Sequence, residues 1–326
     1  MKKNKLLSLT ILLPIALLAL NSCGNSLGYK EGDILYTKTP VFDLSDPSAR
    51  LSFEIELNGS ITSIKSGRIE ISDYNYDSAN KVLTLSGEQL ESISNGEKTL
   101  TIKTSEKSYS QKIMMCTKII KTAQDFQDIN NELEGTYVLG NDINLSTISN
   151  FEPLGRFVSE TDISNKYFHG IFDGNGYTIS NAMVKYSDTD DTNQAIATYT
   201  GHVGTPLFKD IAHQAGDNIG IFQIIGSSGI VRNTVFKDCE VHARTIGGII
   251  AGNNSGNIEN CLVSGGKVNI STHFWDNDCN TGSVAGINAG SGIISNVIST
   301  GKSSITSTYI DYSDDYIGQV ATGGEH

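Results

Sequence analysis

Val231-Arg232-Asn233, Ile258-Glu259-Asn260 and Ile294-Ser295-Asn296 are three copies of one unit in the second half of the chain. An earlier stretch, Ile179-Ser180-Asn181, has the same pattern. Repeats that keep their apolar residues in phase over a few tens of residues are typical of stacked coils, which bury their apolar sides against one another. The intervening segments are short and β-branched, are bounded by Gly, Asn and Ser, and have no helical period. The pattern therefore predicts a parallel β-solenoid.

Two rows of aligned side chains follow from this prediction. We expect a buried row made of Val231, Ile258 and Ile294, and an amide row at a bend made of Asn233, Asn260 and Asn296. Ile179 is also expected inside the coils. Asparagine suits a bend because it tolerates left-handed backbone geometry and bonds to its own backbone. Val235 and Leu262, two places after their asparagines, are also expected inside the coils.

The first 22 residues predict export. Lys2, Lys3 and Lys5 precede an apolar run from Leu6 to Leu20 that is too short and wrongly flanked for a stable membrane span. The run ends in Leu20-Asn21-Ser22-Cys23, which resembles the lipobox of bacterial lipoproteins. The resemblance implies a signal peptide over 1–22, a lipidated Cys23 and a tether over 23–32.

Lipidation at Cys23 would make the membrane a partner of this chain, because several acyl chains on one residue anchor firmly. Gly24 follows Cys23, and no Asp stands there to signal retention at the inner membrane. The expected location is therefore the bacterial cell envelope, at the outer membrane or the cell surface.

Composition narrows the partners further. The formal net charge is −12, and removing the signal peptide takes away three lysines and no acid. This balance argues against nucleic acid and against anionic membrane surfaces as partners. The other cysteines, Cys116, Cys239, Cys261 and Cys279, contain no C-x-x-C pair, so a zinc site is not expected and no disulfide pairing is predicted.

Residues 33–116 have a different texture. Leu51, Phe53, Ile55 and Leu57 alternate with polar residues, and Asn58-Gly59 is expected to form a hairpin turn. Turn signals recur about every 8–12 residues and predict a small β-sandwich. The stretch from Tyr74 to Ile102 resembles immunoglobulin-like modules of bacterial surface proteins. We interpret it as a spacer that lifts the solenoid off the membrane.

A short helix is predicted between the two parts. Thr122 is a natural N-cap with Asp125 in an approximate capping box, and Phe126, Ile129 and Leu133 form one apolar stripe before Gly135. A helix laid over the first coil would protect its open strand edges.

Residues 117–326 carry a more specific resemblance. The stretch from Phe168 to Asn181 resembles the N-terminal region of bacterial surface β-helices with the GLUG motif. The motif itself resembles Ile246-Gly247-Gly248-Ile249 through Asn260, and Gly282-Ser283-Val284-Ala285-Gly286 through Asn296. Such regions occur in adhesin-like proteins and upstream of the catalytic domain in immunoglobulin A1-cleaving metallopeptidases. The resemblance implies a right-handed parallel β-helix and a surface role, and it identifies no ligand.

Enzymatic signatures are weak. None of the six histidines belongs to His-Glu-x-x-His, and the arginines at 156, 232 and 244 have no adjacent acidic cluster. Gly24-Asn25-Ser26-Leu27-Gly28 matches G-x-S-x-G but falls in the tether, without a strand-to-helix elbow. We therefore predict no catalytic residue and no cofactor.

Three insertions rich in acids and aromatic rings interrupt the repeats, and insertions in solenoids often gather on a binding face. Their acids are Asp188, Asp190, Asp191, Asp276, Asp278, Asp311, Asp314 and Asp315. They do not fit a calcium-binding loop, so no metal site is predicted. Trp275, Tyr309 and Tyr312 are the candidate ligand-binding residues.

These features favour a surface-anchored, adhesin-like binding lipoprotein that contacts glycans or host proteins. Two alternatives stay open: a non-catalytic N-terminal arm of a larger surface peptidase or hydrolase, and a β-helix enzyme that acts on polysaccharides. Gln319–His326 begins another repeat without a second capping element, so we expect the β-helix to be incomplete at this end.

Overall fold

The computed structural model of the chain describes residues 36, 38–46, 48–148, 151–155, 166–185, 218–243, 245–272, 279–307 and 316–318. Nearly all of the described elements are strands, and most of the sheets are parallel, so the prediction of an all-β chain is confirmed. Among these residues no helix has the length and apolar content needed to span a bilayer. The predicted signal peptide, Cys23 and the tether lie outside the described residues.

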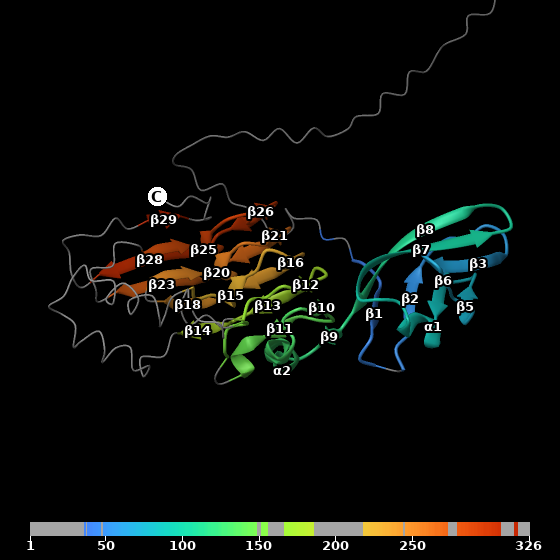
Figure 1. The fold of residues 1–326 in the computed structure, drawn as a ribbon, viewed down its shortest axis with the longest axis horizontal. Helices are drawn as coiled ribbons and strands as arrows, with labels where there is room; N and C mark the ends of the chain where they lie inside the picture. The colour runs from blue at the N-terminus through green and yellow to red at the C-terminus, as the bar shows by residue number, and fades with distance from the viewer. Residues whose placement is uncertain are drawn as a thin grey trace, which may run out of the picture.

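The N-terminal unit consists of two sheets, seen on the right of Figure 1. One sheet has the order β1(Val41–Asp43), β8(Ser108–Cys116), β7(Gly96–Thr104), β3(Ile61–Ser66), β4(Ile69–Glu70). The other has the order β2(Leu51–Glu54), β6(Val82–Leu85), β5(Tyr74–Asp77), and the helix α1(Glu88–Glu91) follows β6. Leu51 and Phe53 are buried while Ser52 and Glu54 are exposed, as the alternating sequence predicts. We call this unit the sandwich.

The predicted hairpin turn at Asn58-Gly59 is wrong. β2 pairs with β6 and β3 pairs with β7, so this dipeptide connects two different sheets. Gly59 has the left-handed backbone expected of a turn, with φ 79°, and a Cβ there would lie 2.5 Å from the hydroxyl of Ser105. The local conformation was predictable, whereas the partner of each flanking strand is decided by packing in the sandwich.

The C-terminal unit is built from five parallel sheets, which we number as faces in the order in which the chain crosses them. The first face contains β9(Lys118–Ile120), β10(Thr136–Leu139), β12(Ile171–Asp173), β16(Ile230–Arg232), β21(Asn257–Glu259) and β26(Ile293–Ser295). The second contains β11(Ile143–Asn144), β13(Thr178–Ser180), β17(Val235–Lys237), β22(Leu262–Ser264) and β27(Ile298–Ser299). The third contains β14(Met183–Lys185), β18(Glu240–Ala243), β23(Lys267–Thr272) and β28(Lys302–Ser307).

The fourth and fifth faces complete each coil. The fourth contains β19(Ile246–Gly248), β24(Asn280–Gly282) and β29(Tyr316–Gly318), and the fifth contains β15(Phe222–Ile225), β20(Ala251–Asn254) and β25(Ala285–Asn288). From β16 to β20 the chain crosses all five faces once, and β21 then pairs with β16 in parallel. This repeated path fits a β-solenoid, and we call the unit the solenoid (Figure 1).

One ladder of the interior matches the sequence prediction. On the first face, Phe172, Val231, Ile258 and Ile294 lie in register on successive strands. Val231 and Ile258 are fully buried, and Ile294 packs on the same core while partly buried.

Ile179 is buried but belongs to the second face, where it pairs with Phe236. Ile179-Ser180-Asn181 is therefore not a copy of the unit ending in Asn233; Phe172-Asp173-Gly174 occupies that place. Asn181 instead lies at the next bend, beside Asp238, where both residues have positive φ. Both bends of a coil follow a β-branched strand and need left-handed backbone, so one sequence pattern fits either of them.

The predicted amide row is present at the bend between the first and second faces. Asn233, Asn260 and Asn296 have φ of 53°, 50° and 50°. Asn260 Nδ2 donates to Asn233 Oδ1 at 3.3 Å, and Asn296 Nδ2 donates to Asn260 Oδ1 at 2.6 Å. Asn233 Nδ2 continues the row by donating to the buried carboxylate of Asp173 at 3.0 Å.

The capping helix α2(Ala123–Gln127) begins where the sequence predicts. Thr122 Oγ1 accepts from the amide of Asp125 at 3.0 Å, and Asp125 Oδ2 accepts from the amide of Thr122 at 2.9 Å. The helix is shorter than predicted, because a 3-10 turn over Asp128–Asn131 replaces its last part. Phe126 lies 5.4 Å from Phe172, ring centroid to centroid, and so covers the first coils.

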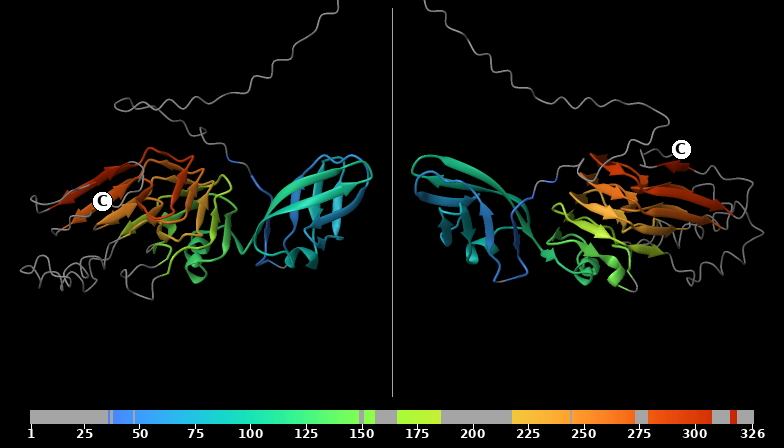
Figure 2. Two further views of the ribbon diagram at one scale, coloured as in Figure 1. Left: turned by 45° about the horizontal axis from the view of Figure 1, so that its top comes forward. Right: turned by 180° about the vertical axis from the view of Figure 1, so that it is seen from behind.

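Residues 36 and 38–40, which we call the strap, lie against the outside of the solenoid and lead into β1 of the sandwich (Figure 2). Tyr36 packs on Val235, Leu262 and Ile298 of the second face. Val235 and Leu262 are thus buried, as predicted, but outside the coils rather than inside them, where Phe236 and Val263 lie. The outward residues of β17 and β22 are apolar because the strap covers them.

Sandwich and solenoid share further contacts. β8 leads into β9 through Thr117 alone, and Asp43 Oδ2 accepts from the amide of Ile119 at 3.0 Å. Arg232 donates to Asp173 Oδ2 at 2.8 Å and reaches Glu97 Oε2 of the sandwich at 3.3 Å. The two units are therefore joined by the direct connection from β8 to β9, by the strap, and by one ion pair between Arg232 and Glu97.

Candidate functional site

The carboxyl ends of the third face form the most distinctive edge of the solenoid. Because β14, β18, β23 and β28 are parallel, their carboxyl ends lie along one edge. Each of the three insertions follows one of these ends: residues 186–217 follow β14, 273–278 follow β23, and 308–315 follow β28. β18, in contrast, continues almost directly into β19. We call this edge the insertion edge.

The predicted ligand-binding residues Trp275, Tyr309 and Tyr312 lie outside the described residues, but the points at which their segments begin are described. Thr272 and Ser307, the last residues of β23 and β28, are in register. Neighbouring strands are about 4.8 Å apart, so the two segments start side by side. Trp275 and Tyr309 follow within three residues, a reach of at most about 11 Å from each strand end.

The outer surface of the third face carries a polar network next to this edge. The carboxylate of Glu240 lies 2.8 Å from His242 Nε2 and 3.5 Å from Asn269 Nδ2. Asn269 Oδ1 accepts from the hydroxyl of Ser304 at 3.1 Å. His242, Asn269 and Ser304 occupy one register position on three successive strands, so the network crosses the face at right angles to the strands.

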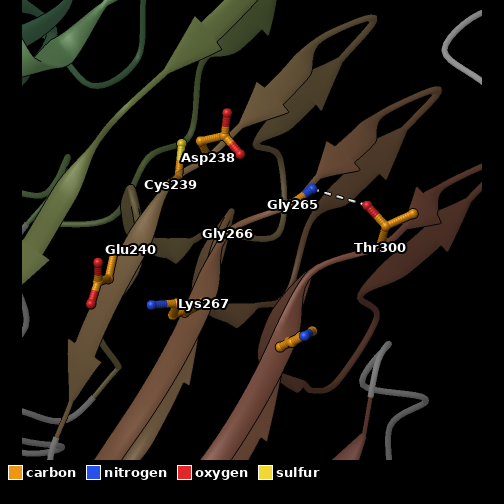
Figure 3. A pocket seen from close by; sticks show the side chains of 8 residues that line it. Asp238, Cys239, Glu240, Gly265, Gly266, Lys267 and Thr300 are labelled. Carbon is orange, nitrogen blue, oxygen red and sulfur yellow. Dashed lines mark hydrogen bonds between the residues drawn. The ribbon is translucent and has the colours of Figure 1, made fainter.

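A hollow of about 300 Å³ lies at the other end of the third face, at the bend from the second face (Figure 3). It is lined by Asp238, Cys239, Glu240, Gly265, Gly266, Lys267, Thr300 and Lys302. Gly265 and Gly266 have positive φ and leave the floor without side chains, and the amide of Gly265 donates to Thr300 Oγ1 at 2.9 Å.

Two lysines border this hollow. Lys267 and Lys302 are in register on adjacent strands, and neither forms an ion pair with another residue of the described ranges. Glu240 occupies the same register position on β18, directly opposite Lys267, so the row that borders the hollow carries charges of both signs. The arrangement suits hydrogen bonding to a polar ligand.

The nucleophiles near this surface are inactive at neutral pH. Cys239 borders the hollow, but burial raises the pKa of its thiol to about 12. Burial likewise raises the pKa of Cys261 to about 12 and raises that of Cys116. These three thiols are buried and free, and Cys279 is buried as well. Within the described ranges no three His, Cys, Asp or Glu residues gather closely enough to hold a metal ion.

The sequence analysis did not predict the polar network or the hollow, although the sequence contains a pattern that marks both. Glu240-x-His242, Lys267-x-Asn269 and Lys302-x-Ser304 share one alternation, which becomes visible only when the repeats are aligned by strand register. The repeats can be aligned in this way only after the inserted residues of the longer coil have been identified.

Comparisons with known proteins add little to this picture. No protein-family model matches the chain, and no solved structure matches it. A stretch of 130 residues, 40% of the chain, is 26% identical to halomucin of Haloquadratum walsbyi (strain DSM 16790 / HBSQ001). The chain covers 1% of the length of halomucin, so the similarity concerns one short part of a much longer protein.

Proposed function

We propose that this chain is a lipid-anchored, adhesin-like protein of a bacterial cell envelope that binds glycans along the insertion edge. In this proposal residues 33–116 form an immunoglobulin-like sandwich, and residues 117–326 form a right-handed parallel β-helix of the GLUG type. The observation that carries the proposal is the origin of all three acidic and aromatic insertions at the carboxyl ends of one sheet.

The chemistry of these segments suits sugars. Aromatic rings such as those of Trp275, Tyr309 and Tyr312 combine a large apolar face with a polar group, which matches the alternating faces and hydroxyls of a pyranose. Carboxylates, amides and hydroxyls supply acceptors and donors for the sugar hydroxyls. The network of Glu240, His242, Asn269 and Ser304 extends this set over the adjacent face.

Binding is tested with the soluble chain from Gly24 to His326 on a glycan array, followed by titration of the best ligand. Trp275→Ala should weaken binding at least about tenfold, which corresponds to about 1.4 kcal/mol. Tyr74→Ala is the matched control, because Tyr74 is an exposed aromatic residue of the sandwich and should leave the affinity unchanged. Absence of glycan binding, or equal affinities of Trp275→Ala and the unaltered chain, would sink the proposal.

The anchor is tested separately. Radiolabelled palmitate should be incorporated into the full chain but not into Cys23→Ser, and only the full chain should sediment with membranes. Cys23 precedes Tyr36 by 13 residues and belongs to neither folded unit, so the substitution should leave the melting temperature of the ectodomain unchanged. If the two proteins label and fractionate alike, the chain is not a lipoprotein.

A further inference from the structure

The described residues that precede the sandwich in the sequence lie against the solenoid. Tyr36 lies against the second face of the solenoid, Lys38 Nζ lies 4.5 Å from the ring centroid of Tyr177, and the amide of Thr39 donates to Asn175 Oδ1 at 3.0 Å. Only then does β1 pair with β8 of the sandwich. From its N-terminal side the chain thus meets the solenoid first, then the sandwich, and then the solenoid again.

Tyr36 rests on a row of apolar side chains, Val235, Leu262 and Ile298, which we call the seat. Val235 and Leu262 occupy adjacent outward positions of β17 and β22, yet they are only 5% and 7% exposed because Tyr36 covers them. Ile298 continues the row on β27. Gly176 adds to the fit, since a Cβ there would lie 3.1 Å from Cβ of Tyr36. Removal of apolar side chains from water holds the strap in place.

The length of the tether limits how far the seat can lie from a lipid anchor on Cys23. Thirteen residues separate Cys23 from Tyr36. A chain of that length spans at most about 47 Å when fully extended. The nine-residue strands β7 and β8 are about 30 Å long and extend away from the solenoid.

We infer that the flank of the solenoid around Tyr36, Val235, Leu262 and Ile298 is the part of the molecule held next to the lipid bilayer, and that the sandwich is the distal part. This inference rests on the lipidation of Cys23 in the proposed function. It is the reverse of a spacer that lifts the solenoid off the membrane. The insertion edge stays accessible, because β23 and β28 point away from the sandwich and the strap (Figure 1).

The test places a fluorophore, through an unnatural amino acid, at one of two exposed positions. Lys237 ends β17 close to the seat, and Glu106 lies at the tip of the hairpin between β7 and β8. The protein is bound to vesicles whose lipids carry a headgroup quencher. Quenching at position 237 should be at least twofold stronger than at 106. Equal quenching at the two positions, or stronger quenching at 106, would overturn the inference.

A second variant tests whether the seat is the cause. Tyr36→Ser should release the strap up to β1, lengthen the free tether by five residues, and bring the quenching at the two positions closer together. Tyr74→Ser, on the sandwich, is the matched control and should keep the difference. Circular dichroism checks that Tyr36→Ser is folded. If the folded variant keeps the full difference in quenching between positions 237 and 106, the seat does not orient the molecule.

The two proposals fail separately. Without acylation in cells the lipoprotein proposal is lost, but a maleimide lipid can still be coupled to Cys23 in vitro. The coupling is selective because Cys116, Cys239, Cys261 and Cys279 are buried. The quenching experiment on coupled protein then decides the orientation on its own.

Discussion

At the scale of the residue, the bends are held by asparagines that combine two properties. Asn260 adopts φ of 50° and also bridges Asn233 and Asn296 through its amide. Asn260→Ala should lower the free energy of unfolding by about 2 kcal/mol, since it loses both hydrogen bonds and places a Cβ in left-handed backbone. Asn260→Gly should cost only about 1 kcal/mol, because glycine adopts this backbone freely. Urea denaturation measures both values, and equal losses would show that backbone strain plays no part.

This residue scale was largely predictable from the sequence. The aliphatic and amide rows of Val231, Ile258, Asn233 and Asn260 follow from a repeat that keeps its phase. The sequence could not predict that Ile179 lies on the second face rather than the first, because two bends in each coil require the same residue types. Only strand register distinguishes them.

At the scale of the element, strands β17 and β22 are buried on both sides for different reasons. Val263 faces the interior of the coil, while Leu262 faces the strap. Val263→Asp should bury an unpaired charge in the core and lower stability by several kcal/mol. Leu262→Asp should cost only about 1–2 kcal/mol, because the strap can lift and admit water. Thermal unfolding compares the two. Limited proteolysis should cut only Leu262→Asp before Val41, and equal melting temperatures would contradict the placement.

Element boundaries were predictable where the signal is local and failed where packing decides. The capping box at Thr122 predicted the start of α2 correctly. The helix end and the partners of the strands beside Gly59 depend on contacts with distant residues, which a local pattern does not contain.

At the scale of the whole molecule, Arg232 connects a buried and an exposed carboxylate across the two units. Asp173 is only 4% exposed, so Arg232→Ala should leave its charge under-compensated and cost about 3 kcal/mol. Glu97→Gln should cost less than about 1 kcal/mol, because that ion pair is open to solvent. Chemical denaturation of both variants checks the ranking, and an equal loss in the two would contradict it.

Glu97 also predicts a dependence on pH. Its hydrogen bond from Lys112, together with the charges of Lys112 and Arg232, lowers its pKa in the folded state. The stabilisation is therefore complete above the unfolded pKa of about 4.3 and is lost as pH falls through the lower folded value. Between about pH 5 and pH 3 the melting temperature of the unaltered chain should fall more steeply than that of Glu97→Gln. Parallel slopes would remove Glu97 from the acid response.

The sequence indicates two units of different texture, but it gives no sign of the strap. Tyr36 meets Val235, Leu262 and Ile298 only because the solenoid brings three distant repeats into one row. Contacts of this kind arise from the stacked fold and have no local pattern.

The unequal coils have an evolutionary consequence. The coil from Asn233 to Asn260 closes in 27 residues and the next, to Asn296, closes in 36, yet their strands remain in register on every face they share. Most of the extra length lies between β23 and β24, at the insertion edge, and the flanking strands keep their register with β18 and β19. Insertions and deletions there are nearly neutral for folding, so this edge can diversify rapidly under selection while the stacked core stays constant. The same freedom makes it a natural place to graft foreign loops in a display scaffold.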